Sequence, residues 1–336
     1  MRNARVAAVA YHLPEEVLTN EMISAEFPEW SVEKIAEKTG VYTRHISGPD
    51  EYSSDLAIAA GATLFEEHGI DPGEIDYLIV CTQSPDYFLP TTACIVQAGL
   101  GLNTSTGAAD INLGCSGYIY AIGQAKGLIE SGQAEKVLVI TADTYTKFVN
   151  ASDKSVRTIF GDGSAATLVT ADGHPESISG ITYGSDGAGA KHLVVPNGGL
   201  RSGTGLQPKS NPTMREISSN GYDLYMDGPE IFNFTLRVVP ETVDAILKKK
   251  GIALDDVDLF VFHQANAFML EHLRKKLGVP REKFFVSLAE TGNTVSSSIP
   301  IALRQADEAG RLSPGSKVML LGFGVGLSWG GALLEW

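Results

Sequence analysis

Three side chains that lie far apart in the sequence, Cys115, His263 and Asn293, are of the types that acyl transfer through a thioester requires. Cys115 stands in the run Asp110–Tyr118, where a buried strand pattern changes into the apolar stripe of a helix that stops near Gly132. A cysteine at the first turn of a helix faces the positive end of the helix dipole, which lowers the pKa of a thiol and favours the reactive thiolate. We therefore expect Cys115 to be a nucleophile.

The histidine and the asparagine stand where a sheet would present them to this nucleophile. His263 follows the apolar run Leu259–Phe262, and the sites of open sheets form at such strand ends. Asn293 lies in a small polar turn before a predicted helix. An imidazole N–H and an amide N–H aimed at one point would stabilise negative charge on a thioester oxygen. The backbone N–H groups of Cys115 and Val325 would form a second such pair, an oxyanion hole for the carbonyl under attack.

Each of these residues also has a purely structural interpretation. A cysteine is often a small core residue, a lone histidine is often a satisfied buried one, and Asn293 would suit a helix cap. The combination of the three favours catalysis. The glycine-rich run 322–326 resembles a nucleotide loop but precedes a strand, and the seven histidines include no pair at metal-ligand spacing. We expect no bound cofactor and no metal.

The elements that position these residues form a diverged internal repeat. Residues 69–80 align with 251–262 at an offset of 182 (251 − 69), and residues 136–140 align with 317–321 at an offset of 181 (317 − 136). Each half predicts a helix ending in glycine, a strand, a helix, a strand, a helix and a further strand. This alternation predicts an α/β fold with mixed or parallel sheets covered by helices. The duplication also explains how such distant residues would meet.

The repeat divides the chain into an N-terminal half, 1–170, with the nucleophile, and a C-terminal half, 171–336, with His263 and Asn293. Between its last two strands the first half has roughly 18 extra residues, about 142–159, which we expect to leave the shared core as a cap insertion. The stretch of about 171–220 is rich in glycine, serine, asparagine and proline, and predicts a surface excursion between the halves.

The composition excludes several classes of partner. A formal net charge of −14 disfavours nucleic acid, so no nucleic-acid partner is expected. No apolar run reaches the length of a membrane span, and the N-terminal residues lack a signal-peptide pattern, so no membrane partner is expected. Three cysteines without metal-ligand spacing, of which Cys81 and Cys94 are expected in the core, are typical of a reducing cytosol. We expect a cytoplasmic protein.

Cys115, the runs His263–Asn266 and Gly292–Thr294, and the tail Gly322–Trp329 together resemble β-ketoacyl-acyl-carrier-protein synthase III, the chain-initiating condensing enzyme. The resemblance covers nearly the whole chain. It implies a homodimer with a thiolase-like fold, a duplicated five-layer αβαβα arrangement with two mixed sheets. It also implies that Cys115 accepts an acyl group, while His263 and Asn293 stabilise the enolate formed when malonyl-acyl-carrier protein loses CO2. Claisen attack on acyl-Cys115 would then give a β-ketoacyl product.

The sequence departs from this family at the substrate mouth. A tryptophan and an arginine that sandwich the CoA adenine in the family align with Lys34 and Lys154, and an arginine used in carrier docking aligns with Phe268. Leu89 aligns with the gate of the acyl pocket. Losing the aromatic ring and the guanidinium removes stacking and a bidentate phosphate fork, which argues against acetyl-CoA as the primer. The other departures at this mouth are Lys38, Pro229 and Asn233.

A group of basic residues follows His263 on the next predicted helix and includes Arg274, Lys275 and Lys276. On an acidic chain this patch would suit an acyl carrier protein, although a solvated helix face has the same pattern. We expect an acyl-CoA or, preferentially, an acyl-carrier thioester to load Cys115 before condensation with malonyl-carrier protein. Two other functions stay open: acyl transfer to an alcohol or amine without decarboxylation, and a non-catalytic partner subunit.

Overall fold

The computed structural model describes residues 2–200 and 222–336, which are organised around two five-stranded sheets. The first sheet has the strand order β1-β7-β6-β4-β5. In it β4 runs parallel to β5 and β6, whereas β7 is antiparallel to both β6 and β1. The strands are β1 (Arg5–His12), β4 (Tyr77–Cys81), β5 (Gly107–Ile111), β6 (Lys136–Asp143) and β7 (Gly163–Thr170).

The second sheet repeats the first strand for strand. Its order is β12-β11-β13-β14-β8, with β11 parallel to β12 and β13, and with β14 antiparallel to β13 and β8. Both sheets are therefore mixed, as the internal repeat predicts. The strands are β8 (Ile178–Ser185), β11 (Leu259–Phe262), β12 (Phe284–Phe285), β13 (Lys317–Gly324) and β14 (Ser328–Glu335).

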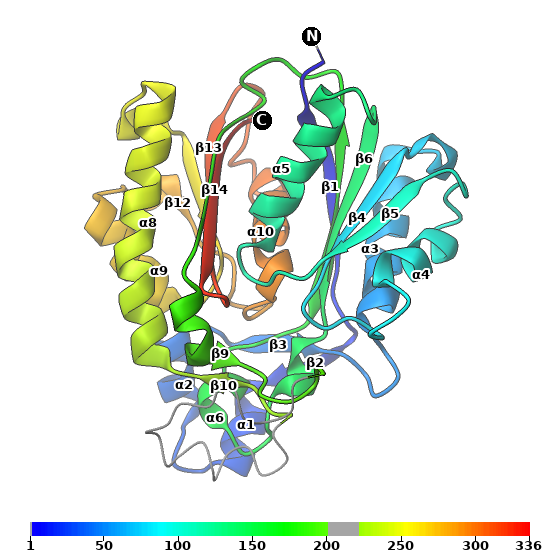
Figure 1. Ribbon diagram of the computed structural model, residues 1–336. Helices are drawn as coiled ribbons and strands as arrows, with labels where there is room; N and C mark the ends of the chain where they lie inside the picture. Colours follow the sequence, from blue (N-terminus) through cyan, green and yellow to red (C-terminus); the bar gives the residue numbers. More distant parts are fainter. Residues whose placement is uncertain (1, 201–221) are drawn as a thin grey trace.

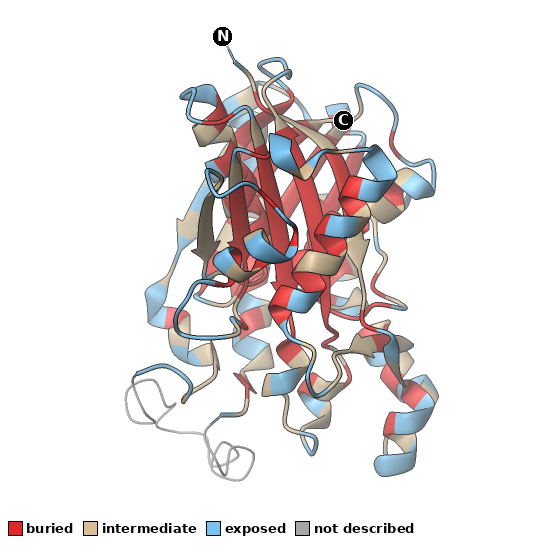
Figure 2. Ribbon diagram, turned by 90° about the vertical axis from the view of Figure 1, so that its right-hand side faces the viewer, coloured by how far each residue is buried: buried red, intermediate tan, exposed pale blue. Residues whose placement is uncertain are grey.

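Helices form the other three of the five predicted layers (Figure 1). The central layer is α5 (Gly117–Glu130) and α10 (Ser298–Glu308), which contact both sheets. Outside the first sheet lie α3 (Ser53–His68) and α4 (Thr92–Gly99), and outside the second lie α8 (Gly228–Lys250) and α9 (Ala267–Leu277). Figure 2 shows the strands buried and the outer helices exposed on one side only. None of the helices described is long and apolar enough to cross a membrane.

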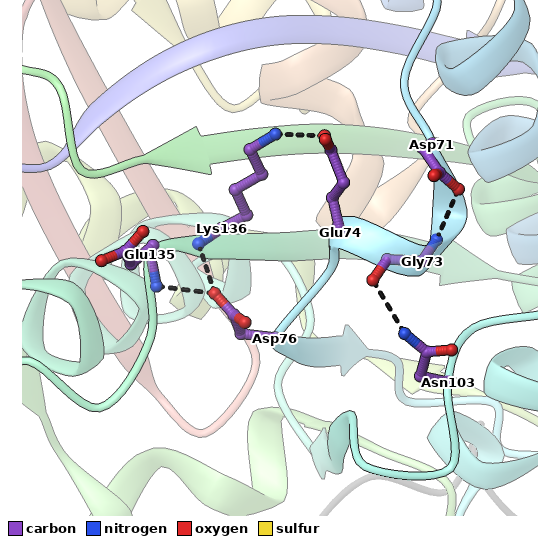
Figure 3. A network of polar contacts seen from close by, with 7 residues as sticks. All are labelled: Asp71, Gly73, Glu74, Asp76, Asn103, Glu135 and Lys136. Carbon is purple, nitrogen blue, oxygen red and sulfur yellow. Dashed lines mark hydrogen bonds and ion pairs between the residues drawn. The ribbon is translucent and has the colours of Figure 1, made fainter.

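The two halves also share the hydrogen bonds that fix the start of their central strands (Figure 3). Asp76, which precedes β4, accepts hydrogen bonds from the backbone N–H groups of Glu135 (2.7 Å) and Lys136 (2.9 Å). Asp258, which precedes β11, accepts one from the backbone N–H of Lys317 at 2.8 Å. The two aspartates are separated by the repeat offset, 182 (258 − 76). The duplication therefore preserves strand register as well as strand order.

A cap covers one end of the two sheets, at the bottom of Figure 1. Buried Arg44 joins its N-terminal part to the insertion, because its guanidinium donates to the Asn20 side chain (2.9 Å) and to the Thr158 carbonyl (2.8 Å). The insertion lies outside the shared core, but its first two predicted residues, Ala142 and Asp143, belong to β6. The cap elements are β2 (Glu16–Thr19), α1 (Asn20–Glu26), α2 (Val32–Thr39), β3 (Thr43–Ile46), η2 (Tyr145–Phe148), α6 (Lys154–Arg157), β9 (Leu193–Val194) and β10 (Tyr225–Met226).

The predicted surface excursion over 171–220 is partly wrong. Strand β8 lies within it and forms an edge of the second sheet, paired with β14. Its glycines hide the strand pattern but suit the packing, since a Cβ on Gly184 would come within 2.1 Å of the Trp329 ring. Pairing and packing from the second half thus override weak local strand propensity. Residues 201–221 of this stretch lie outside the described residues.

Candidate active site

Cys115 lies in the turn between β5 and α5, two residues before the helix begins. The turn presses against β13 at positions where only glycine fits. A Cβ on Gly322 would come within 2.7 Å of the Cys115 carbonyl, and a Cβ on Gly324 would lie 2.8 Å from the Cys115 sulfur. The side chain is only 6% exposed, yet it lines a cavity. The second half of the chain therefore forms one wall of the nucleophile's surroundings.

The pKa of the Cys115 thiol contradicts the predicted depression. Burial, with a smaller contribution from the charge of Asp143, raises the pKa of Cys115 to about 12. The backbone N–H groups of Val325 and Cys115 itself oppose this rise by hydrogen bonding toward the sulfur. The resting group at neutral pH is therefore the thiol. The same two N–H groups are the ones predicted for an oxyanion hole, and they are directed at the reacting atom.

His263 follows β11 directly and is 2% exposed. Its Nδ1 lies 2.7 Å from the Ser298 hydroxyl oxygen, which also accepts a hydrogen bond from the backbone N–H of Gln264 at 3.3 Å. When the Ser298 hydroxyl donates to Nδ1, the ring proton lies on Nε2, which is the tautomer that hydrogen bonding to a substrate oxygen through Nε2 requires. Burial lowers the pKa of His263 to about 3, against a smaller opposing effect of the Val295 carbonyl. The ring is neutral at physiological pH.

Asn293 is held in one orientation by hydrogen bonds on both its backbone and its side chain. Its side-chain oxygen accepts from the Val295 N–H at 2.9 Å, which leaves the amide N–H2 to donate elsewhere. Its backbone N–H donates to the Ile159 carbonyl (2.9 Å), and its carbonyl accepts from Gly161 (3.1 Å). The cap insertion therefore fixes the loop that carries Asn293, although the two segments are far apart in sequence.

Cys115, His263 and Asn293 line one cavity of about 330 Å³. The first comes from the N-terminal half and the other two from the C-terminal half, so the structure brings together the three predicted residues. The remaining wall is mostly apolar, with Ile159, Leu193, Met226, Phe232, Met269 and Phe323 among its residues. Such a cavity excludes water from charges that form inside it and strengthens hydrogen bonds to them.

Two polar residues behind this cavity were missed by the sequence analysis. Ser298 orients His263, as described above. Asp143, at the end of β6, is fully buried and accepts hydrogen bonds from the hydroxyl and N–H of Ser296 and from the Gln83 N–H (2.8 Å). Burial raises the pKa of Asp143 to about 7. Neither residue has a sequence signal, because their partners are brought near only by the packing of the two halves.

A second cavity, of about 580 Å³, is not lined by Cys115. Its wall includes Gln83, Tyr87, Phe88, Tyr145 and Val325. The predicted gate residue Leu89 lies outside the lining of this cavity, and its side chain is 83% exposed. Leu89 therefore lines neither of the two cavities described within its own chain. The neighbouring Tyr87 and Phe88 are also exposed, by 62% and 75%, so an apolar segment projects from this surface.

The substrate mouth has an aromatic group that the sequence comparison overlooked. Pro229 and Phe268, which the resemblance assigns to the substrate mouth, line the first cavity. An aromatic side chain lies close to Lys34, the residue aligned with the tryptophan of the family. Trp30, just before α2, has the ammonium groups of Lys34, Lys38 and Lys154 within 5.1–5.9 Å of its ring centroid. An aromatic face therefore lies among the lysines that the resemblance assigns to the mouth, so the sequence does not lack an aromatic ring there, contrary to the argument against CoA.

The three predicted docking residues at the end of α9 differ in how accessible their charge is. Arg274 forms a bidentate pair with Glu271 and donates to the Val279 carbonyl, so its charge is largely neutralised locally. Lys276 donates to the Leu236 carbonyl at 2.8 Å. Lys275, whose side chain is 69% exposed, lies 3.4 Å from the Glu271 carboxylate, and Lys276 is exposed as well. The patch is positive but weaker than the sequence suggests.

The other two cysteines are also accounted for. Cys81 is fully buried in β4, as predicted, and its thiol donates to the Leu113 carbonyl at 3.1 Å. Cys94 is exposed on α4 and not in the core, contrary to the prediction. Neither lines the cavity that contains Cys115, His263 and Asn293. Cys115 is therefore the cysteine with access to a substrate-sized space beside His263 and Asn293.

Known proteins resemble this chain over its full length. Models of 3-oxoacyl-[acyl-carrier-protein] synthase III match residues 109–187 and, for its C-terminal part, 247–336. β-Ketoacyl-[acyl-carrier-protein] synthase III of Clostridium perfringens is 39% identical over 100% of both chains, and that of Caldanaerobacter subterraneus is 36% identical over 99% of this chain and 98% of its own.

Solved structures agree. A crystal structure of a 3-oxoacyl-(acyl-carrier-protein) synthase III superposes with a TM-score of 0.93 at 46% identity, covering 99% of this chain and 100% of that one. The crystal structure of 3-oxoacyl-(acyl carrier protein) synthase III from Pseudomonas aeruginosa superposes with a TM-score of 0.88 at 32% identity. The match covers 100% of this chain and 98% of that one. These matches confirm the predicted thiolase-like fold and the class of acyl-transferring condensing enzyme. The chain belongs to the 3-oxoacyl-[acyl-carrier-protein] synthase III family.

Proposed function

We propose that this protein loads an acyl group on Cys115 and condenses it decarboxylatively with malonyl-acyl-carrier protein, giving a β-ketoacyl product. The observation that carries the proposal is the convergence of Cys115, His263 and Asn293, from two halves of the chain, on one apolar cavity. Each has the hydrogen-bond environment that its role requires. The names of the relatives, which all describe acyl-carrier-protein synthases, support the same reaction.

In the first step the Cys115 sulfur attacks the carbonyl carbon of an acyl thioester. The backbone N–H groups of Cys115 and Val325 donate to the oxygen that becomes negatively charged. The bond from the acyl carbon to the donor sulfur breaks, and the donor leaves as a thiol with the proton that Cys115 gives up. Because the resting group is a thiol, proton loss and attack are coupled.

In the second step the malonyl thioester of the carrier protein enters the same cavity and loses CO2. The electron pair of the broken C–C bond moves onto the thioester oxygen as an enolate, to which His263 Nε2 and the Asn293 amide donate hydrogen bonds. The neutral imidazole suits this role because it stabilises the charge without protonating the carbanion carbon. That carbon then attacks the acyl-Cys115 carbonyl, the C–S bond breaks, and the sulfur regains a proton.

The finer assignments belong to the same proposal. The halves 1–170 and 171–336 act as one catalytic body. Acyl carrier protein docks beside α9, with Lys275 and Lys276 offering charge and Arg274 mainly ordering the helix. The exposed apolar segment that contains Leu89 supports a homodimer, in which a gate would come from the neighbouring subunit. The cysteine usage supports a cytoplasmic location.

The experiment that tests this function measures CO2 release and product mass together. The protein is first acylated by a thioester panel, and then isotopically labelled malonyl-acyl-carrier protein is added. We expect one CO2 for each β-ketoacyl-carrier formed, and no β-ketoacyl product from the Cys115→Ala variant, which has no sulfur to carry the acyl group. Acyl transfer to an added alcohol or amine without CO2 release would replace the proposal with the alternative transferase reaction.

A further inference from the structure

The loop that carries Asn293 contains a strained residue two positions farther on. Val295 is fully buried and has a backbone φ of 53°, and no other residue except glycines has a positive φ within the described ranges 2–200 and 222–336. A β-branched side chain is unfavourable in this left-handed region, because its Cβ comes too close to the backbone. Such a conformation persists only where the surrounding contacts hold it in place.

Val295 acts on both side chains that would stabilise the enolate. Its backbone N–H donates to Asn293 Oδ1 at 2.9 Å, which leaves the amide nitrogen of that side chain to donate elsewhere. Its carbonyl interacts with the His263 ring and raises the pKa of the ring, against the larger opposing effect of burial. If the Val295 backbone rotated to an ordinary conformation, its N–H and its carbonyl would both move. The relative placement of Asn293 and His263 therefore depends on this strained residue.

Asp143 holds the residue that follows Val295. Oδ2 of its fully buried carboxylate accepts hydrogen bonds from the hydroxyl and the backbone N–H (3.2 Å) of Ser296, and Oδ1 accepts one from the Gln83 N–H at 2.8 Å. Asp143 and Gln83 belong to the N-terminal half and Ser296 to the C-terminal half. Burial raises the pKa of Asp143 to about 7, and the hydrogen bonds from Ser296 and Gln83 oppose that rise. The carboxylate therefore joins the loop of Asn293 to the ends of β4 and β6.

We propose that Asp143 and Ser296 are positioning residues for decarboxylation, which hold Val295 in its left-handed conformation and so fix the Asn293 amide relative to His263; this inference rests on the proposed function. Neither Asp143 nor Ser296 lines the cavity that contains Cys115, so they act on substrate only through the loop. A carboxylate suits this role, because hydrogen bonds to a charged acceptor are stronger than those to a neutral one.

The charge of Asp143 also acts on the nucleophile, and this separates positioning from a general structural role. Burial, followed by the charge of Asp143, raises the pKa of Cys115 to about 12. Asp143→Asn removes that charge with little change of shape. At about pH 8 more of Cys115 should then be thiolate, and acylation should be at least as fast as in the wild type. A variant that only loosened the fold would slow acylation.

The same substitution should slow decarboxylation. An asparagine has a single side-chain oxygen, so its amide N–H2 must face one of the N–H groups, of Ser296 or Gln83, that the carboxylate accepts. We expect decarboxylation by Asp143→Asn to fall roughly ten- to hundredfold, because a displacement of about 1 Å at a catalytic group can have an effect of that size. Ser296→Ala removes one of the hydrogen bonds, and decarboxylation should fall about tenfold with acylation unchanged.

The experiment follows the two steps separately at about pH 8. Intact-protein mass spectrometry at short times measures acylation of Cys115 by the thioester of the panel that acylates the wild-type protein fastest. Release of labelled CO2 from malonyl-acyl-carrier protein measures decarboxylation. The double variant of Asp143→Asn with Ser296→Ala should decarboxylate no more slowly than Asp143→Asn alone, because both residues act through one contact.

Asp110→Asn is a matched control. The Asp110 carboxylate also accepts two backbone N–H groups, of Thr92 and Ala93 (2.7 Å each), but at the start of α4, so this variant should keep the wild-type ratio of the two rates. Equal loss of both steps in Asp143→Asn, normal decarboxylation by Ser296→Ala, or additive losses in the double variant would each overturn the inference. Absence of CO2 release by the wild-type protein would instead overturn the proposed function, so the two failures are distinguishable.

Discussion

The two halves of the molecule share strand order, strand direction and the aspartate that fixes each central strand, yet equivalent positions do different work. Cys81 and His263 occupy equivalent positions by the repeat offset (263 − 182 = 81). Cys81 is enclosed by the core, and burial, followed by the charge of Asp143, raises its pKa well above the ordinary value. His263 lines a cavity and has a hydroxyl to fix its tautomer. The two halves therefore share the same strand scaffold. The equivalent strand ends differ in whether the side chain reaches a cavity, as His263 does and Cys81 does not.

The largest effect should separate the two buried cysteines. Cys115→Ala should abolish acyl-enzyme formation, because neither of the other two cysteines lines the cavity that contains Cys115, His263 and Asn293. Cys81→Ala should still be acylated, since that thiol contacts only the core and the Leu113 carbonyl. Intact mass and peptide mapping after exposure to an acyl thioester measure both. Labelling of the Cys115→Ala protein at Cys81 would show that Cys81 is accessible to substrate, contrary to the position of its thiol in the core.

The next largest effect concerns the contribution of the second half. His263→Ala and Asn293→Ala should accept an acyl group on Cys115 but lose decarboxylation by roughly 10²–10³-fold each, the usual cost of removing one oxyanion donor. Malonyl-carrier decarboxylation is followed separately from acylation. His68→Ala, at the exposed end of α3, provides a histidine control that should behave as wild type. If both site variants condense at the normal rate, the second half has no role in charge stabilisation.

The two steps should differ in pH dependence. The pKa of Cys115 is raised to about 12, so its thiolate fraction grows as pH rises, and the acylation rate should climb roughly tenfold per pH unit between about pH 6 and 9. The pKa of His263 is lowered to about 3, so the ring is neutral throughout this range and decarboxylation should stay flat. Single-turnover rates for each step measure this. An acylation plateau below pH 8 would favour the helix-dipole thiolate expected from the sequence.

A smaller effect is expected at Ser298, which acts on His263 without touching substrate. Ser298→Ala removes the hydroxyl that is hydrogen-bonded to His263 Nδ1, and decarboxylation should fall about tenfold while acylation is kept. Ser297→Ala is the matched control. Ser297 is the residue next to Ser298, but its hydroxyl donates to the Gly163 carbonyl (3.0 Å) and not to His263. A purely structural role would lower thermal stability equally in both variants, without a selective loss of decarboxylation, and Ser298→Thr would then rescue nothing.

The sequence predicted those features that depend on local pattern. Local pattern singled out Cys115, His263 and Asn293, which the structure brings to one cavity, because each stands at a strand end or helix start, and the repeat offset predicted the two-sheet fold because it relates whole segments. The features that failed depend on packing between segments far apart. The pKa of Cys115 is set by burial and Asp143, strand β8 forms through β14, and Trp30 meets Lys154 only after the cap folds. No local signal carries these contacts.

The smallest effect should come from the basic end of α9. Reversing Lys275 and Lys276 to Glu changes the local charge by four units, but Lys276 also donates to the Leu236 carbonyl and neighbouring Arg274 is already paired with Glu271, so the field that a carrier protein meets is modest. We expect KM for malonyl-carrier protein to rise about three- to fivefold at low salt, with kcat and acylation by a minimal thioester nearly unchanged. The difference should shrink as salt is added, since screening weakens steering between exposed charges. The control is the double variant Lys248→Glu with Lys249→Glu. It makes the same charge change at the C-terminal end of α8, whereas the first turn of that helix lines the cavity. An equal rise in KM for that control would show that net charge alone, and not a docking site on the second half, governs the encounter.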